Sequence, residues 1–353
     1  WCRDRAIYLA LVESISIADG GEDQKKGRDA IPSILSDALA VSFDNHVGHD
    51  YLNDYEERYD FYHQTEEKIP FDLDFFNKIT KGGLCNKSLN IALAGTGVGK
   101  SLFMCHVASS CLLQNKNVLY ITMEMAEEKI AERIDANLLN VNIQEIADLP
   151  RQMFETKVSN ICKKTQGSLI IKEYPTKSAS TQTLRAHLEK LRKREVPIDM
   201  IIVDYGDLLR PVSAQKEKRN ELESIYEEMR GIAQEYECPV WTASQTNRSG
   251  LNADVITMES ISEAFNKCFV ADFICSISRT AEDKAANTAR MFVAKNRNGI
   301  DGLVYPMYMD TRNIELKVLP YQGDTPSSIA TITAKEQREK LREKYKEFKE
   351  GRK

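Results

Sequence analysis

The sequence predicts an α/β fold with a mostly parallel sheet flanked by helices and antiparallel strands at its C-terminal side. From about residue 70, apolar runs of strand length alternate with amphipathic stretches of helix length. This alternation is typical of strand–helix–strand units that build a parallel sheet. The later apolar runs follow one another without helices between them. Strands joined that closely are predicted to pair as antiparallel hairpins.

Nine strands are predicted in this part of the chain, each from a short apolar run. They cover residues 89–94, 117–123, 168–173, 199–205, 239–244, 271–278, 289–295, 302–308 and 313–318. Helices fit between most of the earlier strands, at 100–115, 126–139, 181–194 and 216–236.

The first 69 residues precede this pattern and contain two predicted helices. Residues 1–17 have helical apolar spacing, and a Gly-Gly pair ends it. A second helix is expected over residues 31–43, with Pro32 in its first turn. Because the chain begins with Trp1 rather than Met, we expect a fragment whose upstream part is missing.

The other end of the chain is predicted to be a charged tail over residues 321–353. A helix is expected from Ala334 to Lys353, with one apolar stripe that is too thin to hold it strongly to a core. The chain is therefore divided at about residues 18, 69 and 320, and the main domain covers 70–320.

The bulk composition limits the classes of protein to consider. The net charge is −5, so a nucleic acid would have to be held by local basic patches rather than by the overall field. The eight cysteines include no C-x-x-C pair, which is typical of core thiols in a reducing cytosol, and we expect a cytoplasmic protein. No apolar run is long enough to cross a bilayer, so no membrane partner is expected.

The strongest chemical signal is a strand, a glycine-rich turn and a helix start at residues 89–102. The turn reads A-G-T-G-V-G-K-S, a Walker A loop with alanine where glycine is commoner. Its glycines let backbone N–H groups converge on phosphate oxygens at the positive end of the helix dipole. Lys100 is expected to reach the β- and γ-phosphates, and the Ser101 hydroxyl to ligate Mg²⁺. The predicted nucleotide-binding residues are Ala94, Gly95, Thr96, Gly97, Val98, Gly99, Lys100, Ser101 and Leu102.

A second acid is needed to help hold Mg²⁺, and it should end a buried strand. Asp204 follows four apolar residues in MIIVDYGD (200–207) and meets this requirement. Asp207 is the competitor, but it lies past the strand in a predicted turn. The sequence therefore favours Asp204, with Ser101, as the metal-holding pair.

Hydrolysis also needs a base that orients water. Glu124 stands at the end of the apolar run VLYITMEM, where the ligands of a parallel sheet bind. The alternative is an acid that only complements the helix dipole, as Glu127 and Glu128 can. At a third strand end, Gln245 is placed to hydrogen-bond the γ-phosphate and report its loss.

A separate cationic segment, FVAKNRNGIDG, covers residues 292–302. Lys295 and Arg297 are two residues apart on a predicted strand, so they point to the same face. A turn follows at Asn298-Gly299. From these residues alone, the segment is either a site for an anion or a solvated basic hairpin.

These motifs, in this order, resemble the RecA-like ATPase domain of hexameric DnaB-type replicative DNA helicases, and are closest to those of T-even-like phages. The resemblance runs from about residue 70 to 318. It rests on FDLDFFNKITKGGL before the Walker A strand, MEM around Glu124, IIVDY at Asp204, SQTNR at Gln245, and K-x-R-N-G at Lys295.

The resemblance implies an enzyme that hydrolyses ATP with Mg²⁺ and moves 5′–3′ along single-stranded DNA as a homohexameric ring. It also implies a primase and a helicase loader as partners, and the host cytoplasm as location if the chain is phage-encoded. Residues 1–18 would be a remnant of an N-terminal domain or linker, residues 19–69 a linker region, and 31–43 its linker helix.

The resemblance also assigns roles to individual residues. Glu124 would be the catalytic glutamate, and Arg133, nine residues later, would lie against the nucleotide base. Arg297 would be an arginine finger supplied to the next subunit, with Lys295 as a second γ-phosphate contact. Such a finger can be worth about 10³–10⁵ in rate.

Two loops are expected to face DNA in the channel of such a ring, at residues 209–220 and 247–255. Neither is rich in aromatic residues, so backbone tracking fits better than base stacking. Lys216, Lys218 and Arg219 equally fit the solvated face of a charged helix. The stretch 256–272 departs from the family pattern, because it has no arginine. The candidate phosphate contacts are Arg210, Lys216, Lys218, Arg219 and Arg248.

Two other functions remain open on the sequence. A RecA-type recombinase or related filament ATPase shares the core and the acid at the strand end. A non-motor switch ATPase would hydrolyse ATP without translocation. The lead-in segment, the K-x-R-N-G segment and the spacing of Glu124 and Arg133 favour the helicase.

Overall fold

The computed structural model describes residues 2–19, 30–39, 50–63, 68, 77, 80, 82–212, 217–246 and 269–319. The chain forms two compact units, Trp1–Thr65 and Glu66–Lys353. The first unit contains helices α1 (Cys2–Asp19), α2 (Ile31–Leu39) and α3 (Tyr55–His63). Helices α1 and α2 contact each other. They correspond to the helices predicted over residues 1–17 and 31–43, although residues 40–43 lie outside the described residues.

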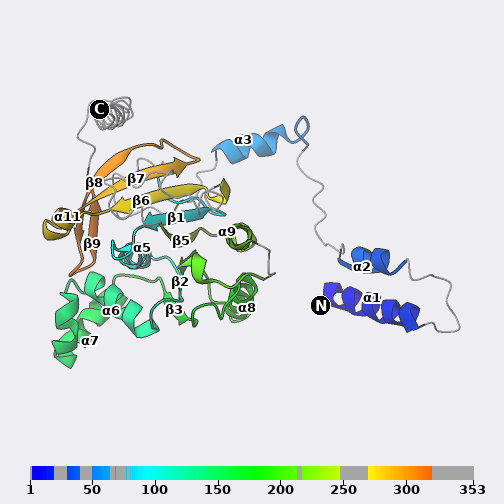
Figure 1. The fold of residues 1–353 in the computed structure, drawn as a ribbon, viewed down its shortest axis with the longest axis horizontal. Coiled ribbons are helices and arrows are strands. Elements are labelled where there is room, and N and C mark those ends of the chain that lie inside the picture. The colour runs from blue at the N-terminus through cyan, green and yellow to red at the C-terminus, as the bar shows by residue number, and fades with distance from the viewer. Residues whose placement is uncertain are drawn as a thin grey trace, which may run out of the picture. The chain divides into compact units, whose positions relative to one another are not determined.

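The second unit is built on a nine-stranded sheet of order β3-β2-β4-β5-β1-β6-β7-β8-β9 (Figure 1). Strands β1 to β6 pair with one another in parallel, whereas β7, β8 and β9 continue the sheet from β6 in antiparallel pairs. The predicted fold class is thus confirmed, and all nine strands lie within two residues of their predicted bounds. They are β1 (Leu89–Ala94), β2 (Val118–Thr122), β3 (Leu169–Glu173), β4 (Met200–Asp204), β5 (Val240–Gln245), β6 (Phe273–Ser278), β7 (Thr288–Asn296), β8 (Val304–Asp310) and β9 (Glu315–Val318).

Helices cover both faces of the parallel part of the sheet. Helices α5 (Lys100–Leu113) and α6 (Glu127–Leu138) pack on one face, and α8 (Thr181–Arg192) and α9 (Lys218–Glu235) on the other. The sequence of β1 is almost continuously apolar because both faces of the strand are buried. Alternate residues enter different cores, Ala92 on the α5 side and Ile91 on the α9 side. Strands buried on both faces are typical of parallel sheets.

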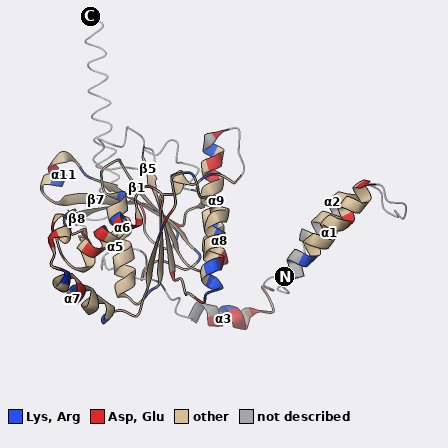
Figure 2. Cartoon of the chain, turned by 90° about the horizontal axis from the view of Figure 1, so that it is seen from below, with Lys and Arg blue, Asp and Glu red and all other residues tan. Residues whose placement is uncertain are grey.

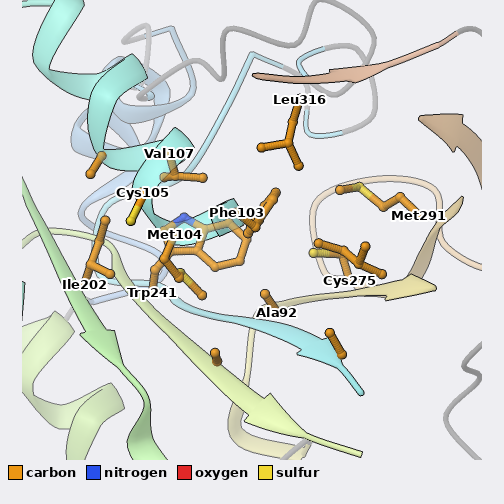
Figure 3. Close-up of a cluster of buried hydrophobic side chains, with 14 of the residues drawn as sticks. Ala92, Phe103, Met104, Cys105, Val107, Ile202, Trp241, Cys275, Met291 and Leu316 are labelled. Atoms are coloured by element: carbon orange, nitrogen blue, oxygen red, sulfur yellow. The ribbon is translucent and has the colours of Figure 1, made fainter. Parts of the chain in front are cut away.

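The core on the α5 side fixes the helix that follows the glycine-rich turn (Figure 3). Phe103 of α5 meets the Trp241 ring of β5 edge to face, with ring centroids 5.5 Å apart. Trp241 also contacts Phe273 of β6 in the same way, at 6.1 Å. Aromatic pairs of this geometry stabilise a core beyond the area that they bury. These contacts hold the first turn of α5 against β5 and, through Trp241, link it to β6.

The sequence did not predict the elements between β2 and β3 that follow α6. The structure has a 3₁₀ helix, η2 (Ile143–Asp148), and a helix, α7 (Arg151–Cys162), in this segment. Neither element contains a buried residue, but Phe154, Val158 and Ile161 of α7 have helical apolar spacing, which was the available signal. The helix α11 (Ala281–Ala285) is too short to show such a spacing, and its capping box at Thr280 and Asp283 was the available signal.

Several sequence predictions fall outside the described residues. They concern the tail helix at 334–353, the loop at 247–255, and the basic residues Lys216 and Arg248. No helix in the described part of the chain combines the length and apolarity that a membrane span needs.

Candidate active site

The loop between β1 and α5 is the candidate phosphate cradle. Gly97 and Gly99 have φ angles of 71° and 122°, a region that side chains other than glycine rarely adopt. At Gly99 an added Cβ would also lie 2.3 Å from the Met309 Cε atom. The tip of the loop is exposed at Thr96 and Gly97. The other predicted residues lie at the end of β1, in the loop, or in the first turn of α5, namely Ala94, Gly95, Val98, Lys100, Ser101 and Leu102.

Lys100 faces a cluster of acids at the C-terminal ends of the parallel strands. Burial lowers the pKa of Lys100. Three carboxylates act against this shift, those of Glu124, Asp204 and Asp207. The Lys100 Nζ atom lies 5.3 Å from the centre of the Tyr205 ring, close enough for a cation–π contact. The structure thus gathers one cation and three acids from four segments at the C-terminal edge of the sheet, where the parallel strands end.

Asp204 has the surroundings of a metal-holding carboxylate. It ends β4 and is fully buried, and its Oδ2 atom accepts a hydrogen bond of 2.8 Å from the Tyr120 hydroxyl. Burial raises the pKa of Asp204, while the Tyr120 and Ser101 hydroxyls oppose the rise. Its Oδ1 atom is buried and has no hydrogen-bond partner within the described part of the chain. A buried carboxylate oxygen left in this state beside a serine hydroxyl suits a hard cation such as Mg²⁺.

The competitor Asp207 is engaged elsewhere. One carboxylate oxygen accepts a hydrogen bond of 2.8 Å from the Tyr226 hydroxyl, and the other accepts one of 3.0 Å from the Ser244 hydroxyl. These bonds tie Asp207 to α9 and β5. The geometry therefore favours Asp204 over Asp207 as the residue that holds the metal.

Removing the Tyr120 hydroxyl should destabilise the protein. In Tyr120→Phe the ring still fills its fully buried place, but the Oδ2 atom of Asp204 loses its partner. Leaving a buried acceptor unpaired costs about 1–3 kcal/mol. We expect the free energy of unfolding, measured in urea, to fall by about that amount. An unchanged value would contradict the assigned hydrogen bond.

Glu124 lies just beyond the end of β2 and is exposed toward the cradle side of the sheet. Glu127, in the first turn of α6, has a structural role, because its carboxylate accepts hydrogen bonds from the Glu173 N–H group at 2.7 Å and the Lys172 Nζ atom at 2.9 Å. These contacts lower the pKa of Glu127. Glu124 acts electrostatically on Lys100, and its role as the base stays a prediction.

Two further predicted residues border the cradle. Gln245 ends β5 in register with Ala94, and its side-chain amide donates a hydrogen bond to the Thr96 hydroxyl. The glutamine thus touches the loop that would surround the phosphates. Arg133 lies on α6, and its charge opposes the rise that burial causes in the pKa of both Asp204 and Cys105. A contact of Arg133 with the nucleotide base stays a prediction.

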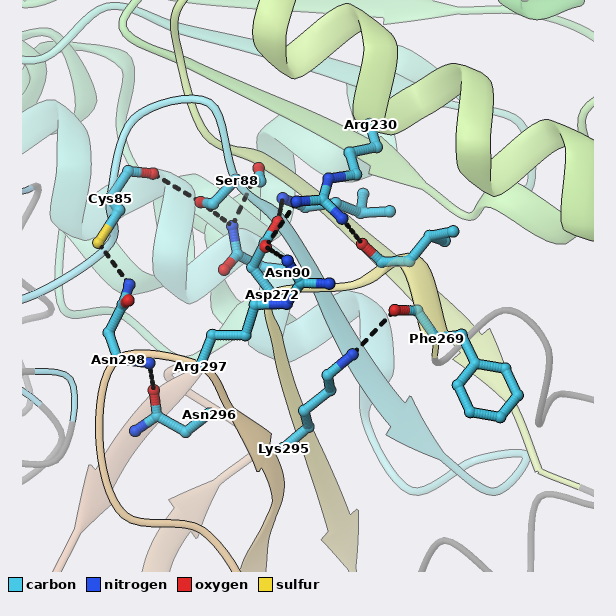
Figure 4. A network of polar contacts seen from close by, with 12 residues as sticks. Cys85, Ser88, Asn90, Arg230, Phe269, Asp272, Lys295, Asn296, Arg297 and Asn298 are labelled. Atoms are coloured by element: carbon cyan, nitrogen blue, oxygen red, sulfur yellow. Dashed lines mark hydrogen bonds and ion pairs between the residues drawn. The ribbon is translucent and has the colours of Figure 1, made fainter. Parts of the chain in front are cut away.

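Arg297 and Lys295 lie at the opposite edge of the sheet, where the parallel strands begin (Figure 4). The Arg297 Nη1 atom is 3.3 Å from the Asp272 Oδ1 atom. The Lys295 Nζ atom donates a hydrogen bond of 2.9 Å to the Phe269 carbonyl. Because Asp272 also bonds to the main chain of Leu89, Arg297 stands at the level where β1 begins.

The position of Arg297 excludes it from the cradle of its own chain. Strand β1 runs from Leu89 to Ala94 before the loop begins. At a rise of about 3.3 Å per residue, this strand alone separates the two edges by roughly 17 Å. A side chain that is anchored at Asp272 does not span this separation. The structure therefore brings together the predicted residues of the cradle, and leaves Arg297 and Lys295 away from them.

The predicted DNA contacts are described only in part. Arg210 and Arg219 are exposed, and α9 begins at Lys218, so Lys218 and Arg219 belong to the first turn of a helix. Charged residues of both signs line α8 and α9 (Figure 2). The described part of this region thus fits a charged helix face as well as a phosphate contact.

The sequence of the chain matches a known family over most of its length. Residues 69–313 match the family described as the DnaB-like helicase C-terminal domain. The chain is 35% identical to a DnaB-like replicative helicase of Enterobacteria phage T4, over 98% of this chain and 76% of that protein. It is 24% identical to the replicative DNA helicase DnaB of Geobacillus stearothermophilus, over 69% of this chain and 55% of that protein.

The fold agrees with the sequence match. The solved structure of a DnaB-like replicative helicase, described together with its interactions with primase, aligns with a TM-score of 0.64 at 16% identity. The alignment covers 91% of this chain and 77% of that one. At this identity the structural match supports the fold alone. The family assignment rests on the family match and on the phage relative. The chain belongs to the DnaB-like replicative helicase family.

Proposed function

We propose that this protein is an ATP-driven replicative DNA helicase that moves 5′–3′ on single-stranded DNA as a homohexameric ring. One observation carries the proposal: the cradle and the cationic segment lie at opposite edges of one sheet. Each subunit then offers a nucleotide site at one edge and an arginine at the other. A closed ring places these edges together, and each site is completed by its neighbour.

The residues of the cradle fit ATP with Mg²⁺. The loop N–H groups and Lys100 would hold the phosphates, and Ser101 with Asp204 would hold the metal. When bound, Mg²⁺ neutralises charge that develops on the phosphate oxygens. The buried Oδ1 atom of Asp204, which has no partner in the described part of the chain, is the observation that supports this assignment.

The remaining side chains would act on water and on the γ-phosphate. The Glu124 carboxylate is exposed at the strand end, where it can accept a proton from an attacking water. Gln245 already contacts the loop through Thr96 and would sense whether the γ-phosphate is present. Arg297 of the neighbouring subunit would neutralise charge in the transition state, with Lys295 as a second cation.

The partners follow from the same assignment. We infer single-stranded DNA in the channel, held through the phosphate backbone, and further copies of this chain in the ring. A primase and a helicase loader are the expected protein partners, and the cytoplasm is the expected compartment. A RecA-type filament ATPase is not favoured, because the family and the phage relative are replicative helicases.

Strand displacement on forked DNA tests this function. We expect ATP-dependent unwinding of forks that carry a 5′ single-stranded tail, and little unwinding of forks with only a 3′ tail. The Lys100→Ala protein serves as the control that should unwind neither. ATP hydrolysis without displacement on either fork would instead indicate a switch ATPase, and an open filament on DNA in electron micrographs would indicate a recombinase.

A further inference from the structure

Asp272 lies at the centre of a polar network at the edge of the sheet opposite the cradle (Figure 4). Its Oδ1 atom faces two guanidinium groups, that of Arg230 at 3.1 Å and that of Arg297 at 3.3 Å. Its Oδ2 atom accepts a hydrogen bond of 3.0 Å from the Leu89 N–H group. The Asp272 side chain is only 14% exposed. One nearly buried carboxylate therefore joins α9, β1 and the end of β7.

The main chain of Asp272 is fixed as firmly as its side chain. Its N–H group donates to the Leu89 carbonyl at 2.8 Å, and its carbonyl accepts from the Arg297 N–H group at 3.0 Å. Arg297 is thus held to the same residue through both its backbone and its guanidinium. This double attachment leaves the arginine few arrangements, and a side chain ordered in advance loses less entropy when it binds an anion.

The two arginines of the network are not equivalent. Arg230 also donates a hydrogen bond of 2.9 Å to the Val270 carbonyl, and its side chain is 25% exposed. The side chain of Arg297 is 45% exposed. A guanidinium has five N–H donors, so the part of Arg297 turned away from Asp272 can still contact a ligand outside its own chain.

The charges of the network also leave Arg297 able to attract an anion. Two guanidinium groups share one carboxylate, so the three side chains together carry a net charge of +1. Arg230 takes part of the negative charge of Asp272, and Arg297 is therefore not neutralised by its partner. The arrangement orients a cation and keeps it attractive to an anion.

We propose that Asp272 is a positioning residue for Arg297, which it holds in the orientation needed to reach the nucleotide of the neighbouring subunit. The inference rests on the proposed role of Arg297 in trans. Asp272 touches neither the cradle of its own chain nor, in this arrangement, the neighbour's nucleotide, and it acts only through the arginine.

The first test is the Asp272→Asn variant, which keeps the shape of the side chain and removes its charge. A small misplacement of a catalytic group can cost up to about 100-fold in rate, and we expect kcat for ATP to fall about tenfold with KM within about twofold. Glu235→Gln is the matched control, since it removes the carboxylate of the ion pair with Arg185, 2.8 Å long, at a site remote from the network. It should keep the parent kcat, and a parent kcat for Asp272→Asn would overturn the proposal.

Mixed assemblies separate a positioning role from a general structural one. Asp272→Asn subunits have a sound cradle and a misplaced finger, so mixing them with Lys100→Ala subunits should restore activity. Mixing them with Arg297→Ala subunits should give no gain over the residual activity of Asp272→Asn alone, because no interface then receives a correctly placed arginine. Failure with Lys100→Ala, or recovery with Arg297→Ala, would each overturn the proposal.

Two further measurements keep this test decisive. If Asp272→Asn does not fold, as judged by thermal unfolding, Asp272→Glu keeps the charge, displaces the carboxylate by one methylene, and should show the same mixing pattern. The mixture of Arg297→Ala with Lys100→Ala tests the trans role itself. Recovery in that mixture together with parent activity of the Asp272 variants would retain the proposed function and reject only the role of Asp272.

Discussion

Replacing Lys100 by alanine is expected to abolish ATP hydrolysis. The ammonium group is partly buried among the carboxylates of Glu124, Asp204 and Asp207, and it is the cation of the cradle. A hydrogen bond to a charged group is worth about 1.5–3 kcal/mol, so ATP binding should weaken roughly 10- to 100-fold in addition. Steady-state ATPase assays and fluorescent-nucleotide titrations measure the two effects.

Two controls show whether this loss is specific to the cradle. Lys164→Ala removes an exposed lysine and should leave both measurements unchanged. Glu124→Gln should bind nucleotide nearly as tightly as the parent protein, while its turnover collapses, because only the orientation of water is lost. Parent-like hydrolysis by Glu124→Gln would show that another group is the base.

Replacing Arg297 by alanine is expected to lower ATP turnover by about 10³-fold or more, which is the range for an arginine finger. Nucleotide binding should change little, because Arg297 lies at the other edge of the sheet from the cradle of its own chain. ATPase assays on the assembled protein test the first expectation, and equilibrium binding of a fluorescent nucleotide tests the second.

Mixing two inactive proteins shows whether Arg297 acts across a subunit boundary. An Arg297→Ala subunit keeps a sound cradle, and a Lys100→Ala subunit keeps a sound finger. Where they meet in the right order, one complete site forms, and ATPase activity should reappear once subunits exchange. If exchange is demonstrated and no ratio restores activity, Arg297 serves its own chain or only the fold.

Much of the fold was predictable because its signals are local. The nine strands are short apolar runs, and the helices α5, α6, α8 and α9 carry apolar stripes that the sheet buries. Helix α7 was missed although Phe154, Val158 and Ile161 have helical spacing, and the sheet leaves none of its residues fully buried. The order of the strands is also not written in any local run, because β1 lies between β5 and β6, which follow far later in the chain.

The sequence by itself determined the chemistry of the cradle. The glycines, Lys100 and Ser101 are contiguous, and backbone geometry over a few residues follows from the residues themselves. Only the tertiary structure decided which groups surround them: Tyr120 donates to Asp204 across 84 positions of sequence, and Asp272 joins Leu89 across 183. Such contacts depend on strand order and register. For the same physical reason, the sequence could present Arg297 as a cation, but only the fold could place it where β1 begins, at the ends of the strands opposite the cradle.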